Sequence, residues 1–152
     1  MTLAIDMIGT HQGSGTRTYN INFCQYISKH NIDQKIFIFI TKDYLENIDI
    51  NKDSNIEYKI KSTILTNIFL RILWMQFFLP FELKFLRVQH LFSPMNMGPI
   101  ILKLFSIKFT LALHSNLPWV FFSKMPGNLL RNFLTRTLME ISVRVCDRLI
   151  VD

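Results

Sequence analysis

The segment that most constrains the fold is Lys35 to Thr41, KIFIFIT. Its five central residues are all β-branched or aromatic, and no polar residue interrupts them. A strand with one face in water alternates apolar and polar side chains, whereas a continuous apolar run is typical of a parallel strand covered on both faces. The segment therefore predicts a buried strand within a parallel sheet.

The other apolar patterns along the chain alternate between strand and helix lengths. Ile56 to Lys61, IEYKIK, alternates strictly and predicts a half-exposed edge strand. Further short strands are predicted at Leu3–Ile8, 89–94, Lys108–Leu113 and 147–152. Helical spacing predicts helices at Thr16–His30, at 64–88 with a bend or break at Pro80, at Ile100–Phe105, and at Leu129–Val145 after an Asn128 cap. This order predicts one α/β domain over residues 1–152, with a mainly parallel sheet and helices on both faces.

Amino-acid composition limits the cellular compartment and the classes of binding partner that fit this chain. Lys and Arg number 17 against 11 Asp and Glu, which gives a formal charge of +6. The cations form no stripe with interleaved aromatics, so we expect no nucleic-acid partner, although an anionic lipid surface or a phosphorylated ligand fits the charge. Cys24 and Cys146 are far apart and have no metal-ligand spacing, which predicts free thiols in a reducing, cytoplasmic compartment and no bound metal.

Two apolar stretches raise the question of membrane contact. The longer, Ile64 to Phe81, contains Arg71 and two amide side chains, so it predicts a helix that is either buried or lies at a membrane surface, and not a spanning helix. The second, Leu117 to Phe133, mixes aromatics with Lys124 and Arg131. It fits either a membrane-interface contact, an acceptor-binding lip, or aromatics packed onto the domain.

The loop after the first predicted strand contains Gly13-Ser14-Gly15-Thr16, directly before a predicted helix. Glycines let backbone amides approach an anion, and the helix amino terminus adds partial positive charge. The loop is neither a full dinucleotide fingerprint, because Thr18 replaces the third glycine, nor a P-loop. By itself it is either a phosphate-facing loop or a tight turn.

Ligands of parallel α/β sheets bind beyond the carboxyl ends of the strands, which selects three loops in this chain. These are the glycine loop, SPMNMG after the fourth strand and HSNLPW after the fifth. His114, at the end of the fifth strand, is the strongest catalytic candidate, with a structural histidine as the alternative. His11 and His90 are weaker candidates, and the sequence shows no catalytic triad, carboxylate pair or metal cluster.

Taken together, GSGTRTY, HLFSPMN, LALHSNLP and DRLIVD resemble the N-terminal half of a family-four glycosyltransferase of GT-B fold. The resemblance spans nearly the whole chain and implies a Rossmann-like sheet. The family's fifth-strand motif usually has an acidic residue where this chain has Ser115, and its sixth strand leads into Ser or Thr, whereas this sequence stops at Asp152.

The resemblance implies transfer of a sugar from a nucleotide-sugar donor to a glycan or lipid-linked acceptor, as in cell-surface polysaccharide synthesis. It implies that the donor is a substrate and that no separate cofactor is needed. The residue roles implied are donor diphosphate binding by Gly13, Gly15 and Thr16, catalysis by His114, and an acceptor side lined by Arg17, Ser93 and Asn96.

In that family a C-terminal domain binds most of the nucleotide, and the sequence lacks it. We therefore expect a truncated product or one half of a split enzyme, inactive without a C-terminal-domain partner chain. We also expect a cytoplasmic location, peripheral at the inner face of an anionic membrane. A noncatalytic α/β binding or regulatory domain is the alternative, and an oxidoreductase is disfavoured by the broken glycine fingerprint.

Overall fold

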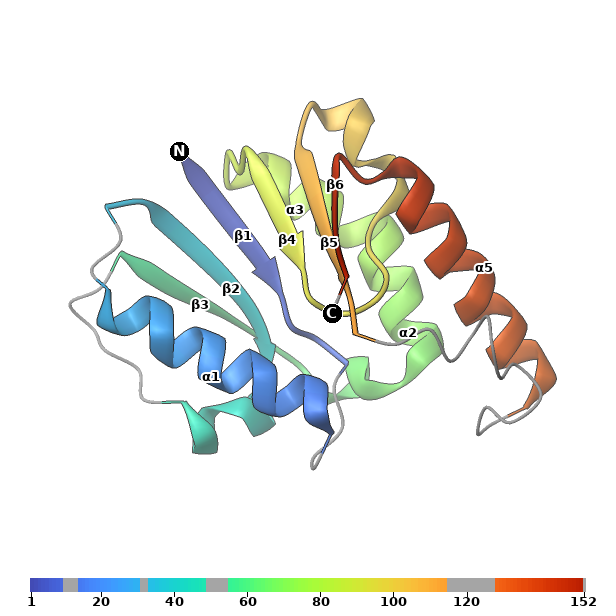
Figure 1. The fold of residues 1–152 in the computed structure, drawn as a ribbon, viewed down its shortest axis with the longest axis horizontal. Coiled ribbons are helices and arrows are strands. Elements are labelled where there is room, and N and C mark those ends of the chain that lie inside the picture. The colour runs from blue at the N-terminus through green and yellow to red at the C-terminus, as the bar shows by residue number, and fades with distance from the viewer. Residues whose placement is uncertain (10–13, 31–32, 49–54, 115–127, 152) are drawn as a thin grey trace.

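The computed structural model describes residues 1–9, 14–30, 33–48, 55–114 and 128–151. Within them a six-stranded sheet has the order β3-β2-β1-β4-β5-β6, and every neighbouring pair is parallel. Figure 1 shows the strands side by side with their arrowheads at one edge. The strands are β1 Thr2–Asp6, β2 Lys35–Thr41, β3 Ile56–Lys61, β4 His90–Ser93, β5 Lys108–Leu113 and β6 Arg148–Val151. The predicted α/β, Rossmann-like fold class is therefore confirmed.

The two strands singled out by pattern occupy the places expected of them. β2 pairs with β1 on one side and β3 on the other, and all of its residues after Lys35 are buried. β3 is an edge strand, and none of its residues is fully buried. Continuous apolar character in β2 thus reflects cover on both faces, and the alternation in β3 reflects partial exposure.

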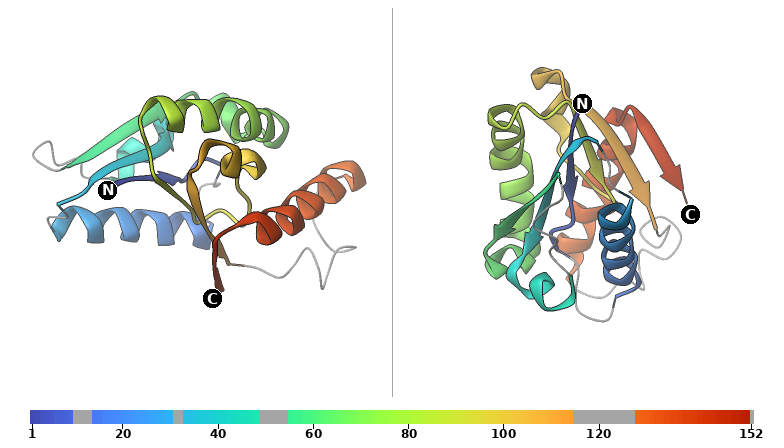
Figure 2. Two further views of the ribbon diagram at one scale, coloured as in Figure 1. Left: turned by 90° about the horizontal axis from the view of Figure 1, so that it is seen from above. Right: turned by 90° about the vertical axis from the view of Figure 1, so that its left-hand side faces the viewer.

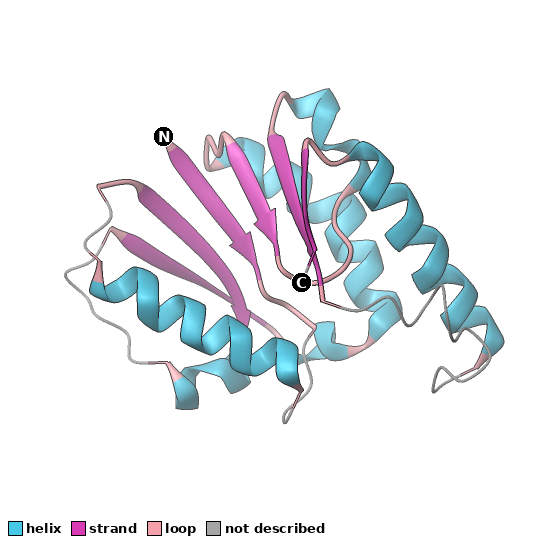
Figure 3. Ribbon diagram, viewed as in Figure 1, coloured by secondary structure: helices cyan, strands magenta, loops and turns pink. Residues whose placement is uncertain are grey.

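Helical segments cover both faces of the sheet (Figures 2 and 3). The elements on one face are α1 Gly15–Lys29 and the 3₁₀ segment η1 Lys42–Asn47. Those on the other are η2 Thr63–Thr66, α2 Ile68–Leu73, η3 Trp74–Phe78, α3 Leu79–Phe85, η4 Ile100–Phe105 and α5 Leu129–Val145. Each face has its own apolar core. Asn128 caps α5 as predicted, accepting a hydrogen bond from Arg131 N at 2.8 Å.

The sequence predicts a bend or break at Pro80, and the helix is not broken there. Helical structure continues through α3 to Phe85, and the deviation lies just before the proline, where η3 is a π-helical turn. Leu79 N–H bonds to Trp74 O, five residues back. A proline disrupts the preceding turn because it lacks an N–H and its ring crowds a carbonyl, and a wider π turn relieves that conflict without ending the helix.

No helix among the described residues is long and apolar enough to cross a bilayer. The predicted helix of residues 64–88 is instead divided: a 3₁₀ turn precedes Asn67, whose side chain accepts hydrogen bonds from Phe69 N and Leu70 N and caps α2. The regular helix therefore starts at Ile68.

Cys24 is expected to be unreactive in the folded protein, whereas Cys146 reacts. Both thiols are free, but Cys24 is fully buried on the α1 face, and burial raises its pKa to about 12. At pH 8 a pKa of 12 leaves about one thiolate in ten thousand, and the buried sulfur is also shielded from reagent. Titration with an aromatic disulfide reagent should give one reactive thiol natively and two after denaturation. A Cys146→Ser control should lose the native signal, and equal reaction of both thiols in the native protein would contradict this placement.

Candidate functional site

The strand order reverses between β1 and β4, because β2 and β3 lie on one side of β1 while β4, β5 and β6 lie on the other. At such a reversal the connections from adjacent strands leave in opposite directions and open a crevice beyond the carboxyl ends. Figure 1 shows the amino terminus of α1 at this edge of the sheet. The candidate site is therefore built from the segments that come directly after β1, β4 and β5.

The amino terminus of α1 begins at Gly15 with Ser14 as its cap. The Ser14 side chain accepts from Arg17 N at 3.2 Å. Among the described residues, a Cβ placed on Gly15 would meet no atom within 4 Å, so there is free space beside this residue. Thr16 is half-buried beside it, while Gly13 lies outside the described residues. An exposed helix amino terminus of this kind can bind an anion through its backbone amides.

Arg17 does not point toward an acceptor as predicted from the resemblance, since it is 4 % exposed and engaged within the fold. Its guanidinium pairs with the Asp43 carboxylate, donates to Asp43 O at 2.6 Å, and lies over the Tyr44 ring at 4.3 Å. The Tyr44 hydroxyl in turn donates to Met7 O at 3.1 Å and accepts from Asn20 Nδ2 at 3.4 Å. These contacts tie α1 and η1 to the end of β1.

Two buried groups of opposite charge, Asp6 and Arg71, lie near the same loop, and the sequence analysis did not identify them. Asp6 ends β1 with no exposed surface, and one carboxylate oxygen accepts from Ile8 N at 3.1 Å. Arg71, from α2, is 4 % exposed and packs against Gly9. Among the described residues, the second Asp6 oxygen and the Nε and Nη2 of Arg71 have no hydrogen-bond partner.

Burial and the charge of the other residue shift the pKa of Asp6, and likewise that of Arg71, in opposite directions. Burial raises the pKa of Asp6, while the positive charge of Arg71 and the Ile8 amide lower it in part. Burial lowers the pKa of Arg71, while Asp6 and Tyr44 raise it in part. Buried polar atoms without partners are rare in folded proteins and mark either bound water or a ligand position. The pair is thus a polar centre at the carboxyl edge of β1.

Position 9 requires a glycine for both its backbone conformation and the space around it. Its φ is +97°, which L side chains rarely adopt, and an added Cβ would lie 2.5 Å from Arg71 Cδ. Two signals in the sequence pointed to this centre: Asp6 is the only charge in LAIDMI, and Arg71 is the only charge in IFLRILWMQFF. A single charge within a long apolar run is expensive to bury unless it has a partner, and the two charges compensate each other.

The loop after β4 is held to the end of β5. Asn96 has φ +61°, and its side-chain oxygen accepts from His114 N at 2.6 Å. Its own N–H donates to Ala112 O at 3.2 Å. Ser93 is fully buried and donates to Met97 O at 2.7 Å. The structure therefore brings Asn96 and His114 together, and it uses Ser93 to shape the loop and not to line a surface.

His114 is half-buried at the end of β5, where its ring lies 4.7 Å from that of Tyr19 on α1. His90, by contrast, starts β4 at the opposite edge and bonds to Thr110 Oγ1 at 2.7 Å, so it belongs to no carboxyl-edge site. His11 lies outside the described residues. Across the described parts of the chain, no group of three or more His, Cys, Asp or Glu could hold a metal ion.

Comparison with known proteins adds no support for the family resemblance, which rests on the four sequence motifs alone. No model of a known protein family matches the chain, and no curated protein matches it. The described site therefore consists of the open first turn of α1, the buried Asp6–Arg71 pair and the Asn96–His114 contact, all at the carboxyl edge of a Rossmann-like parallel sheet.

Proposed function

We propose that this chain is the N-terminal domain of a family-four glycosyltransferase, which transfers a sugar from a nucleotide-sugar to a glycan or lipid-linked acceptor in cell-surface polysaccharide synthesis. The observation that carries the proposal is the open first turn of α1 at the strand-order reversal, where a Cβ on Gly15 would touch nothing. The four sequence motifs support the family assignment, and two cysteines without a disulfide framework fit a cytoplasmic location.

The chemistry of sugar transfer suits this edge of the sheet. The bond between the sugar and the diphosphate breaks, and negative charge develops on the departing nucleoside diphosphate. Amides at a helix amino terminus stabilise such charge without reorganising. Arg71, whose charge is partly offset by Asp6, lies beside Gly9, where the loop leading to α1 begins. The His114 ring, which packs against Tyr19 while Asn96 holds the His114 backbone N–H, would form the wall that faces the sugar.

Titration of the 18.0 kDa chain with nucleotide-sugars, followed by amide NMR, tests the proposal. Uridine, guanosine and thymidine diphosphate sugars should be compared. Saturable shifts at Gly15, Thr16 and His114 are expected for the correct donor. Shifts confined to the amino edge around His90 would overturn the proposal.

Replacing Gly15 with alanine is expected to weaken nucleotide-sugar binding about tenfold, since each hydrogen bond to a charged group contributes roughly 1.5–3 kcal/mol. The methyl group stands where the diphosphate must approach, yet it touches nothing in the protein. The melting temperature should be unchanged or slightly higher, because alanine is the better helix former. Thr18→Ala, exposed on the same helix, is the matched control and should bind normally. Equal binding by Gly15→Ala and the control would place the ligand elsewhere.

A further inference from the structure

The outer face of the α2–η3–α3 segment is apolar although it points away from the sheet. The inward side chains Trp74, Met75, Leu79 and Leu83 are buried. The outward ones on the same segment are large and exposed, and together with a neighbour on η4 we call them the Phe face: Leu73 (51 %), Phe77 (61 %), Phe78 (66 %), Phe81 (61 %), Phe85 (87 %) and Leu104 (82 %). Single exposed apolar residues are common in soluble proteins, but a contiguous set on one helical segment marks an interaction surface.

The Phe face continues onto η4. The Phe81 ring meets the Phe105 ring edge-on, with centroids 5.1 Å apart, so α3 and η4 form one surface. Leu104, next to Phe105, is almost fully exposed. Lys84 is the only exposed charged residue between Phe77 and Phe85. The surface is therefore a broad apolar strip and not a groove fitted to one side chain.

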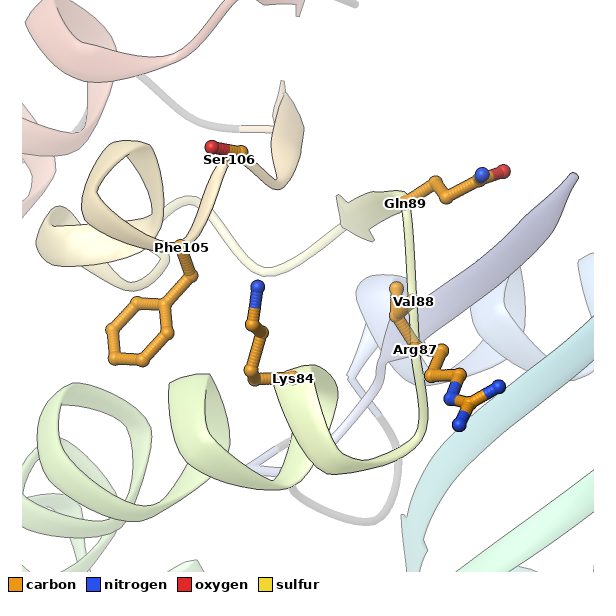
Figure 4. A pocket seen from close by; sticks show the side chains of 6 residues that line it. All are labelled: Lys84, Arg87, Val88, Gln89, Phe105 and Ser106. Carbon is orange, nitrogen blue, oxygen red and sulfur yellow. The ribbon is translucent and has the colours of Figure 1, made fainter.

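A basic pocket of about 460 Å³ adjoins the end of this strip. It is lined by Lys84, Arg87, Val88, Gln89, Phe105 and Ser106 (Figure 4). Figure 4 shows the Lys84 side chain pointing from α3 toward the Phe105–Ser106 turn. Because Gln89 directly precedes β4, the pocket lies at the amino edge of the sheet, opposite the candidate site.

The cations of the pocket are not neutralised within the fold. Neither Lys84 nor Arg87 forms an ion pair with any described residue. The nearby acid Glu82 is engaged by Lys61 at 2.7 and 2.8 Å. The helix-end carbonyls at the pocket are capped, since Arg87 N bonds Lys84 O and Ser106 N bonds Lys103 O. Positive side chains therefore remain available to an anion beside an exposed aromatic strip.

We propose that the Phe face lies on an anionic bilayer, with Lys84 and Arg87 at the end of the strip binding lipid headgroup phosphates. Phenylalanine side chains enter the boundary between headgroups and acyl chains, and flanking cations bind anionic headgroups. The formal charge of +6 adds a general attraction to such a surface. A second copy of the chain fits less well, because a two-fold contact through this face brings the Lys84 and Arg87 cations of both copies together. This inference does not rest on the proposed transferase function.

Vesicle flotation of the full chain tests the inference, using phosphatidylcholine vesicles and the same vesicles with added phosphatidylglycerol. Strong binding is expected only with phosphatidylglycerol. Phe77→Gln/Phe85→Gln should weaken partitioning tenfold or more, about the loss expected from two partly inserted rings. Tyr26→Gln, an exposed aromatic on the opposite sheet face at 58 %, is the matched control and should bind normally.

Charge variants separate the pocket from overall charge. Lys84→Gln/Arg87→Gln should reduce binding to phosphatidylglycerol vesicles about thirtyfold, from roughly 1 kcal/mol per cation near the surface. Lys29→Gln/Lys42→Gln makes the same net change among exposed cations of the α1 face and should lose much less. Absence of vesicle binding, or equal losses in both charge variants, would overturn the proposal. A dimer in sedimentation that Phe77→Gln/Phe85→Gln abolishes would assign the face to self-association instead.

Discussion

Replacing Arg71 with methionine is expected to lower the free energy of unfolding by about 3–5 kcal/mol. The substitution keeps most of the apolar stem but removes the only described cation that offsets the fully buried Asp6 carboxylate. Breaking a buried charge pair on one side leaves an uncompensated charge, which costs more than the intact pair contributes. Urea denaturation monitored by circular dichroism measures the loss. The double variant Asp6→Asn/Arg71→Met should recover most of it.

The deficit of Arg71→Met should shrink as the pH falls. Burial already raises the pKa of Asp6, and losing the arginine raises it further. The folded state then binds a proton at a pH where the unfolded chain, with its ordinary pKa of 3.8, does not. Stability therefore increases as pH drops through the raised pKa toward the unfolded value, and it is lowest near neutrality. A pH-independent deficit, or no rescue by the double variant, would show that the two charges are not coupled.

Replacing Gly98 with alanine is expected to destabilise the fold by about 2–3 kcal/mol, as is typical of a methyl group forced into a packed core. The new Cβ would lie 2.1 Å from Cζ of Phe109, which is 2 % exposed on β5. The backbone cannot easily retreat, because Gly98 N bonds Ser142 Oγ at 3.1 Å and Gly98 O accepts from Gln76 Nε2 at 3.2 Å. These bonds tie the loop after β4 to both η3 and α5.

Thermal and urea denaturation of Gly98→Ala, Phe109→Leu and the double variant measure this clash. Phe109→Leu removes the ring atoms that the new methyl group meets, so the double variant should be more stable than the sum of the two single losses. Gly15→Ala is the matched glycine control, because its Cβ meets nothing. Strict additivity of the two substitutions would contradict the packing described here.

Local sequence pattern was enough to predict the strands and most of the helices. The runs of β2 and β3 predicted a buried and an edge strand, and both predictions are confirmed. The errors occurred where two local rules compete. Pro80 was expected to bend or break a helix. The helix is not broken, because the π turn at Trp74–Phe78 accommodates the proline, and no periodicity in the sequence distinguishes a π turn from a break.

The site was predicted less well than the fold. The sequence placed Asn96 and His114 in loops after neighbouring strands, and the Asn96 side chain accepts a hydrogen bond from His114 N at this shared edge. Arg17 and Ser93 were assigned to an acceptor surface, yet both side chains serve the fold itself. Side-chain direction depends on which neighbours supply a partner, and Asp43 lies 26 residues from Arg17.

The sequence by itself determined the alternation of strands and helices, since period-2 and period-3.6 burial patterns and caps such as Asn128 act over a few residues. Tertiary structure alone decided the strand order, the burial of both Asp6 and Arg71, and which side of the α2–η3–α3 segment faces the sheet. An apolar helix gives no internal sign of which face is covered. That choice comes from packing against strands far away in the chain, and here it leaves the Phe face outside.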